Sequence, residues 1–167
     1  DKDISILLLV NPDNPSGNFI PKADVLRIAE WCREREVRLL VDESFVDFTE
    51  GFEHNSIIDD GILEAYPNLM VMKSISKSYG VPGLRLGILA TADTQLIARI
   101  KKDVSIWNIN SFAEFYLQIE EKYHKDYLAS LTRIKEERKR FFSKLSSIEG
   151  LRAIPSEANY IMVEITN

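Results

Sequence analysis

The sequence predicts an α/β fold built around a mainly parallel sheet. Apolar segments of strand length alternate along the first half of the chain with segments whose apolar residues recur at helical spacing. This alternation implies right-handed crossover connections between parallel strands. At 167 residues, with 45% hydrophobic and 28% charged residues, the chain has the composition of an ordinary globular protein.

The strands are predicted from short apolar runs that turn-forming residues interrupt. The run at 86–90 follows the run at 69–72 too closely for a crossover helix, so these two strands are expected to be antiparallel. A closing strand is expected near the C-terminal end. The predicted strands cover residues 4–10, 37–42, 69–72, 86–90 and 159–165.

The helices are predicted from apolar residues that recur every three or four positions. Pro21 suits the first turn of a helix. The basic run at 133–140 is interpreted as a solvated face rather than a binding patch, because glutamates interleave it. The predicted helices cover residues 21–36, 62–65, 94–102 and 111–148, with an interruption near His124 and a cap at Gly150.

Residues 74–87 carry the most informative pattern. Lys77 and Arg85 lie there among hydroxyl groups and three glycines. A lysine amine can form a Schiff base with a carbonyl. The hydroxyls of Ser74 and Ser76 can donate hydrogen bonds to phosphate oxygens, and an arginine can bind phosphate through two parallel bonds. These groups together predict a site for a phosphorylated aldehyde, and pyridoxal 5'-phosphate is the cofactor that needs all of them.

Two upstream features support this prediction. Asp42 ends an apolar strand, which is where ligand groups gather in open α/β sheets. Its carboxylate could pair with the pyridinium nitrogen and keep the ring electron-withdrawing. Residues 11–18 follow the first strand and form a rigid loop with two X-Pro pairs and Gly17.

These three motifs, in this order, resemble those of the class I/II aminotransferases, which are fold-type-I pyridoxal-phosphate enzymes. The resemblance covers nearly the whole chain. It implies that Asn14 contacts the 3'-oxygen of the cofactor and that Lys77 holds the cofactor covalently. It also implies that Asp42 faces the ring nitrogen. The cofactor-binding residues it implies are Asn14, Asp42, Phe45, Ser74, Ser76, Lys77 and Arg85, and the catalytic residues are Lys77 and Asp42.

The resemblance also implies a three-layer large domain with a mostly parallel sheet, followed by the start of a small α+β domain. Family members are usually more than twice as long, so the chain is expected to be an incomplete piece. Residues 1–110 are predicted to belong to the cofactor-binding large domain and residues 111–150 to the connecting helices. Residues 151–167 are predicted to start the small C-terminal domain.

One position departs from the commonest family pattern. Many members carry a tyrosine where this chain has Phe45, and its phenol also bonds the 3'-oxygen. Loss of that hydroxyl is expected to shift the electronics of the bound ring modestly while Asn14 remains. The pattern at 42–48 and the elements at 107–111 and 158–162 resemble the branch that contains histidinol-phosphate aminotransferase and threonine-phosphate decarboxylase.

The function implied is transfer of an amino group between an amino acid and a 2-keto acid, with Lys77 as general acid and base. Two alternatives stay open. The same scaffold decarboxylates a phosphorylated amino acid in some relatives, or the chain is a non-catalytic module that keeps only the fold. The latter gains slight support from Phe45, whereas the joint presence of Asn14, Asp42, Lys77 and Arg85 speaks against it. A homodimer is expected for the parent protein, and an isolated fragment need not be active.

Composition excludes several other classes. A net charge of −5 and a pI near 5.2 argue against nucleic acid as a partner. Cys32 is the only cysteine, so no internal disulfide is possible. No run approaches the roughly 18 apolar residues of a membrane span, so a cytoplasmic protein without membrane partners is expected. His54 and His124 lack neighbours at metal-ligand spacing, so no metal site is predicted.

Several polar residues near these motifs have structural interpretations. Glu43 and Asp47 are expected to make structural hydrogen bonds, and Asp59 is expected to lie in a loop or to cap a helix. Asn108 and Asn110 either contact substrate or cap the helix that follows them.

Overall fold

The computed structural model describes residues 4–166 and confirms the predicted α/β fold with a mostly parallel sheet. Four strands form one sheet in the order β1-β2-β3-β4, with β1, β2 and β3 parallel and β4 antiparallel to β3, as predicted. Two further strands pair only with each other. The strands are β1 Ile6–Val10, β2 Arg38–Asp42, β3 Leu69–Ser74, β4 Gly87–Ala90, β5 Leu151–Ala153 and β6 Val163–Ile165.

The helices follow the predicted order, and the predicted break before the longest helix is a 3-10 turn. The closing strand is shorter than predicted, and the hairpin partner β5 and the one-turn helix α3 had no counterpart in the prediction. The α-helices are α1 Lys22–Arg33, α2 Asp60–Ala65, α3 Ile75–Ser78, α4 Thr94–Asp103, α5 Ser111–Ile119 and α6 His124–Ser146. The 3-10 turns are η1 Val46–Phe48, η2 Phe52–His54, η3 Pro82–Leu84 and η4 Glu120–Tyr123.

One face of the sheet is buried under α1 and α2. Leu39 and Leu69 are neighbours in register and fully buried there, in a core that also takes Cys32 from α1. Side chains alternate across a strand, so those between the core positions point to the opposite face. On that face Ile6 and Leu8 remain 54% and 59% exposed. The apolar run of β1 therefore builds both the core and an open apolar face.

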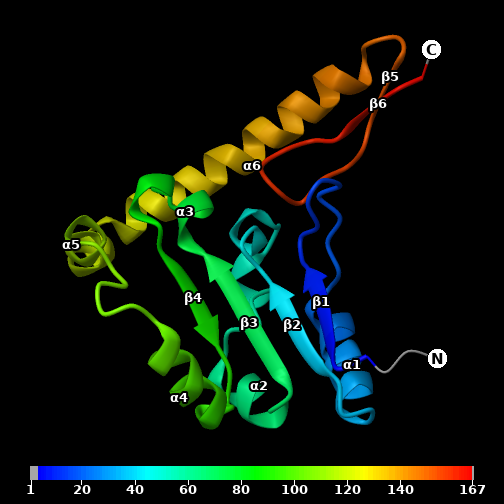
Figure 1. Ribbon diagram of the computed structural model, residues 1–167. Coiled ribbons are helices and arrows are strands. Elements are labelled where there is room, and N and C mark those ends of the chain that lie inside the picture. Colours follow the sequence, from blue (N-terminus) through cyan, green and yellow to red (C-terminus); the bar gives the residue numbers. More distant parts are fainter. Residues whose placement is uncertain (1–3, 167) are drawn as a thin grey trace.

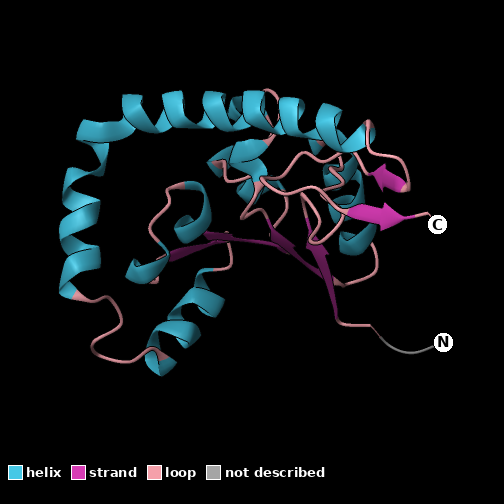
Figure 2. Cartoon of the chain, turned by 90° about the horizontal axis from the view of Figure 1, so that it is seen from above, coloured by secondary structure: helices cyan, strands magenta, loops and turns pink. Residues whose placement is uncertain are grey.

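Helix α6 joins the sheet to the C-terminal hairpin. Figure 1 shows it passing over the carboxyl ends of β1, β2 and β3, and Figure 2 shows β5 and β6 near its C-terminal end, with α5 at its N-terminal end. A second apolar cluster lies under it and combines Phe45 and Phe48 with Leu131 of α6 and Ala158. The long helix thus packs against η1, which follows β2 at the end of the sheet where the parallel strands end.

Arg138 of α6 corrects one expectation from the sequence. It lies within the basic run that was interpreted as a solvated face, yet it is only 8% exposed. Its Nη1 donates hydrogen bonds to the carbonyl oxygens of Phe48 and Ala158 at 2.8 and 3.0 Å. The expectation was wrong for this residue because its side chain supplies donors to backbone carbonyls that are buried away from water.

Among residues 4–166, the structure contains no helix that combines the length and the apolar character needed to cross a membrane.

Candidate functional site

The carboxyl ends of the three parallel strands bring the predicted motifs to one edge of the sheet. Val10 is the register partner of Asp42, and the backbone N–H of Asn11 donates to the carbonyl of Asp42 at 2.9 Å. Asp42 is in turn the register partner of Met72, two residues before β3 ends at Ser74. The segments 11–18, 43–48 and 75–86 therefore begin side by side, at the position where open α/β sheets hold their ligands.

The carboxylate of Asp42 is fixed by Ser44. Its Oδ1 accepts hydrogen bonds from the backbone N–H of Ser44 at 2.9 Å and from the Ser44 hydroxyl at 2.5 Å. The same hydroxyl oxygen accepts from the backbone N–H of Ser74 at 2.8 Å. Both bonds to Asp42 converge on Oδ1, so the carboxylate is oriented while Oδ2 keeps its capacity to accept. Ser44 thus connects Asp42 to the strand that leads to Lys77, a role with no signal in the sequence beyond its place after Asp42.

Lys77 lies in the single turn of α3, with its side chain exposed and resting on an aromatic ring. Its Nζ is 4.5 Å from the ring centroid of Phe45, which is within the range of a cation–π contact. Phe45 is 6% exposed, and the ring of Tyr160 meets it edge-on, with centroids 5.1 Å apart. The Tyr160 hydroxyl donates to the carbonyl of Asp13 at 2.6 Å. The C-terminal segment therefore links Phe45 to the loop that carries Asn14.

That loop is packed tightly against the C-terminal segment. Gly17 has a φ of +73°, and a Cβ there would lie 2.0 Å from the Ser156 hydroxyl oxygen, so glycine is required. The backbone N–H of Glu157 donates to the carbonyl of Gly17 at 2.8 Å. Asn14 itself is exposed, and within residues 4–166 no hydrogen bond joins it to the other predicted site residues.

The antiparallel pairing of β3 with β4 returns Arg85 to the start of α3. Gly87 is the register partner of Ser74, and the backbone N–H of Ile75 donates to the carbonyl of Leu86 at 3.2 Å. Arg85 adopts a left-handed backbone conformation and makes one long hydrogen bond, 3.4 Å from Nη1 to the carbonyl of Pro82. The whole segment 74–92 contains no acidic residue. The segment therefore offers hydroxyl groups, an amine and a guanidinium as hydrogen-bond donors, and it contributes no carboxylate. Such a set of donors suits a doubly charged phosphate.

A largely buried ionic network joins β3, η1 and α6 next to the site residues described above. Lys73 Nζ is 2.6 Å from Asp47 Oδ1, and the Tyr127 hydroxyl donates to Asp47 Oδ2 at 2.8 Å. Glu43 accepts from the Ser56 hydroxyl at 2.6 Å and from a backbone N–H. Burial raises the pKa of the Glu43 carboxyl, and burial followed by the charge of Asp47 raises the pKa of Tyr127. The structural roles expected for Glu43 and Asp47 are confirmed.

Local geometry assigns two further polar residues to helix caps. Asn110 accepts from the Ala113 N–H at the start of α5 and donates to the carbonyl of Leu84, so it caps the helix. Asp59 caps α2 through the Ile62 N–H. Within the part of the chain that the structure describes, no group of three or more His, Cys, Asp or Glu side chains is arranged to hold a metal ion.

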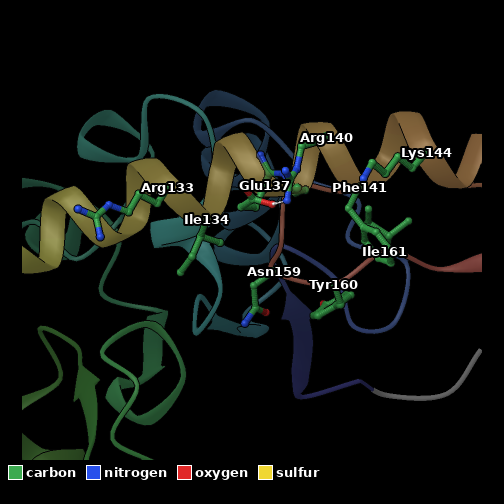
Figure 3. Close-up of a pocket in the computed structure, with 10 residues that line it drawn as sticks. Arg133, Ile134, Glu137, Arg140, Phe141, Lys144, Asn159, Tyr160 and Ile161 are labelled. Atoms are coloured by element: carbon green, nitrogen blue, oxygen red, sulfur yellow. Dashed lines mark ion pairs between the residues drawn. The ribbon is translucent and has the colours of Figure 1, made fainter.

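A cavity of about 440 Å³ adjoins the site along α6. Figure 3 shows Asn159, Tyr160 and Ile161 from the C-terminal segment on one side and the side chains of α6 on the other. The ion pair between Arg140 and Glu137, 2.6 Å long, lies at its border. Tyr160 lines this cavity and also contacts Phe45, so the cavity adjoins the lysine site. Lys77 is not among the residues that line the cavity.

The chain resembles proteins of known sequence. The model of the family described as aminotransferase class I and II matches residues 1–167. CMP-5'-(3-aminopropyl)phosphonate synthase of Streptomyces rubellomurinus is 35% identical over 98% of the chain and 25% of its own length. Threonine-phosphate decarboxylase of Salmonella typhimurium is 30% identical over 96% of the chain and 43% of its own length. The chain thus spans less than half the length of these curated relatives.

Solved structures agree with the sequence matches. A histidinol-phosphate aminotransferase from Clostridium acetobutylicum superposes with a TM-score of 0.87 at 30% identity, over 98% of this chain and 48% of that one. A histidinol-phosphate aminotransferase from Sinorhizobium meliloti, solved in complex with pyridoxal-5'-phosphate, superposes with a TM-score of 0.78 at 26% identity. That match covers 98% of this chain and 43% of the other.

Proposed function

The chain belongs to the aminotransferase class I and II family, and we propose that it carries the lysine site of a pyridoxal-phosphate-dependent aminotransferase. The reaction would move an amino group between an amino acid and a 2-keto acid. The observation that carries this proposal is that segment 74–92, which contains Lys77 and no acidic residue, begins beside the Asp42–Ser44 pair at the carboxyl edge of the sheet. Full-length relatives extend well beyond the chain, so the activity is proposed for the protein that contains it.

The donor set fits the cofactor group by group. Ser74, Ser76 and Arg85 would hold the phosphate, since hydroxyls and a guanidinium stand together without a carboxylate in their segment. Asp42 would pair with the ring nitrogen, because Ser44 fixes its Oδ1 and leaves Oδ2 able to accept a hydrogen bond. Lys77 would bind the aldehyde carbon, and Asn14 would reach the 3'-oxygen from the loop that Gly17 anchors.

The bound cofactor would supply an electron sink for the α-carbon of an amino acid. The negative charge of Asp42 would favour a proton on the ring nitrogen and so strengthen that sink. When Lys77 is not engaged with the aldehyde, its exposed amine can take a proton from the α-carbon and return it as a general acid and base. The amine of Lys77 contacts the face of the Phe45 ring. This ring carries no hydroxyl group that would compete for the proton of the amine.

Decarboxylation of a phosphorylated amino acid is the second candidate, and the relatives favour it specifically. Threonine-phosphate decarboxylase is 30% identical to the chain, and a solved decarboxylase from Sulfurospirillum multivorans superposes with a TM-score of 0.85 at 29% identity. Both reactions begin at the same lysine site. The residues that choose between them must orient the scissile bond, and none of the contacts around Lys77 discriminates the two.

The separate hairpin of β5 and β6 supports a two-domain parent. We propose that residues 1–110 belong to the large domain, 111–150 to connecting helices and 151–167 to the start of a small domain. Strands β5 and β6 pair with each other and not with the four-stranded sheet, which supports a boundary near 151. A homodimeric, cytoplasmic parent is proposed by analogy with the family alone.

The cofactor site is tested by trapping. The purified protein is mixed with pyridoxal phosphate, its visible absorbance is recorded, and borohydride reduction is followed by mass spectrometry of peptides. We expect a single label on Lys77 that Lys77→Ala removes and that Lys73→Arg, a matched change four residues away, retains. A label on another lysine, or no label on the full-length protein, contradicts the proposal and favours the non-catalytic module.

Product analysis separates the two reactions. The full-length protein, loaded with pyridoxal phosphate but not reduced, is incubated with amino acids and their O-phosphates, with and without a 2-keto acid acceptor. Formation of a new keto acid supports transamination, whereas release of carbon dioxide with formation of an amine supports decarboxylation. Lys77→Ala should abolish either product.

A further inference from the structure

A second pocket, of about 230 Å³, lies where the end of α3 meets α5 and the start of α6. None of the predicted cofactor residues lines it. Four phenol rings do, and they come from separate elements, which makes the cluster more than the stripe of a single helix. Two carboxylates and a serine complete the lining. The aromatic and acidic residues are Tyr79, Tyr116, Tyr123, Tyr127, Glu120 and Asp126.

Two of the rings are held rigidly. Tyr79 and Tyr127 stack with ring centroids 4.0 Å apart and an angle of 7° between their planes. The Tyr127 hydroxyl is anchored at 2.8 Å on Asp47, which is itself paired with Lys73. In the stack, each ring covers the inner face of the other ring, and the outer face of each ring is not covered by its stacking partner. The pair therefore offers a preformed aromatic wall that needs no reorganisation before a ligand binds.

A third ring, that of Tyr123, already attracts a cation from the chain itself. Tyr123 is 49% exposed, and the ammonium group of Lys122 lies 5.4 Å from its ring centroid. Cations within about 6 Å of an aromatic centroid are attracted by the negative face of the ring. Lys122 itself is not among the lining residues, and within residues 4–166 the lining contains no lysine or arginine.

The electrostatics of the pocket are negative. Burial, followed by the charge of Glu120, raises the pKa of Tyr79 to about 12 and that of Tyr116 in the same direction. Both phenols line the same pocket as the Glu120 carboxylate. His124 Nδ1 lies 3.5 Å from Glu120 Oε1 and opposes this charge only when the imidazole is protonated. Asp126 adds a second carboxylate to the lining.

We infer that this tyrosine pocket binds a small organic ammonium ion, with the rings of Tyr116, Tyr123 and the stacked pair around the cation and Glu120 beside it. Aromatic rings with neighbouring carboxylates are the surroundings that alkylated ammonium groups prefer, because the rings attract the charge and accommodate the methyl groups. A metal ion fits less well, since the lining has only two carboxylates. An anion is disfavoured by both of them.

The test uses choline and its uncharged isostere, 3,3-dimethylbutan-1-ol, on the full-length protein at pH 8. Binding is followed by calorimetry and by the NMR shifts of the tyrosine rings at constant ionic strength. We expect choline to saturate the site and to bind at least about tenfold more tightly than the isostere, which equals about 1.4 kcal/mol. Equal binding of the two compounds, or no saturation by choline, would overturn the cation site.

Matched variants test the role of the ring faces. Tyr116→Leu should weaken choline binding about fivefold or more, whereas Tyr116→Phe, which keeps the ring, should stay within about twofold. Glu120→Gln should weaken it about threefold by removing one nearby charge. Trp107→Leu removes an aromatic residue that is 91% exposed outside the pocket and should leave binding unchanged. Equal losses in Tyr116→Leu and Tyr116→Phe, with near-UV circular dichroism unaltered, would contradict a site made of ring faces.

Discussion

Asp42 ends β2 and Asp47 lies five residues later in η1, yet their carboxylates have different surroundings. Both oxygens of Asp47 are engaged by side chains of the protein, one by Lys73 and the other by Tyr127, and its side chain is only 6% exposed. Asp42 receives both of its hydrogen bonds, from Ser44, on Oδ1. A carboxylate whose two oxygens are both satisfied internally serves the fold, whereas one that is oriented but only half used can serve a ligand.

The two lysines of the same segment repeat this contrast. The side chain of Lys73 is 14% exposed and forms an ion pair with Asp47. The side chain of Lys77 is exposed, and its amine contacts the face of the Phe45 ring. Asp47 and Lys73 thus form an internal pair, whereas Asp42 and Lys77 are the pair that we propose to contact the cofactor. Substitutions should separate the two pairs, because the first is expected to affect stability and the second is proposed to affect catalysis.

The largest effect is expected for Lys73→Met. Breaking a buried ion pair leaves Asp47 with an uncompensated charge, which costs about 3–5 kcal/mol of unfolding free energy. Urea unfolding followed by circular dichroism measures it. The matched change Lys77→Met should alter the unfolding free energy by less than about 0.5 kcal/mol, because that side chain is exposed. Similar losses in both variants would erase the distinction between the two lysines.

Asp42→Asn should have a nearly comparable effect, on catalysis instead of folding. Asparagine can still accept the hydrogen bonds from Ser44, so the unfolding free energy should change by less than about 1 kcal/mol. Loss of the negative charge should lower the turnover of the cofactor-loaded full-length enzyme about 100- to 1000-fold, by analogy with the loss of one preorganised electrostatic group. A variant that unfolds more easily but keeps its turnover would assign Asp42 to the structural group.

The proposed ligand-facing residues stand in sequence motifs, whereas the residues that support them do not. Asp42, Lys77 and Arg85 belong to motifs whose order along the chain identifies a family, and the match to solved structures confirms the fold-type-I architecture. Ser44 and Tyr127 belong to no such motif. Their roles depend on β2, β3 and α6 meeting in space, with partners 30 and 80 residues away in the chain, which local periodicity does not encode.

Element boundaries were missed for a related reason. The prediction extended the last strand from 159, but Tyr160 uses its hydroxyl and ring to hold Asp13 and Phe45, and the strand begins only at Val163. The charged neighbours of Arg138 likewise predict a solvated side chain, whereas the structure buries it. A single buried cation inside a charged helix has no separate signature in sequence.

A smaller effect is expected for Tyr127→Phe. The change removes one hydrogen bond to a charged group and leaves the stacked ring in place, so the unfolding free energy should fall by about 1.5–3 kcal/mol. Tyr66→Phe, on the far side of the sheet core, serves as control and should change it by less than about 0.5 kcal/mol. If Tyr127→Phe leaves the unfolding free energy unchanged, Lys73 alone is enough to orient Asp47, and the hydrogen bond from Tyr127 does not stabilise this region.

The smallest effect is a pH dependence that arises from Glu43. Burial raises the pKa of this carboxyl above its ordinary value, so the native state keeps the proton in a pH range where the unfolded chain has released it. The contribution of Glu43 to stability therefore falls as the pH rises from the ordinary carboxyl pKa through the folded one, with a slope of at most about 1.4 kcal/mol per pH unit. Glu43→Gln should remove this slope. The lowered pKa values of Glu50 and Asp93 act in the opposite direction and cancel in the difference between the two proteins. If urea unfolding at a series of pH values gives the same slope for both, Glu43 is charged in the fold and belongs with Asp47 as a second internal partner of Lys73.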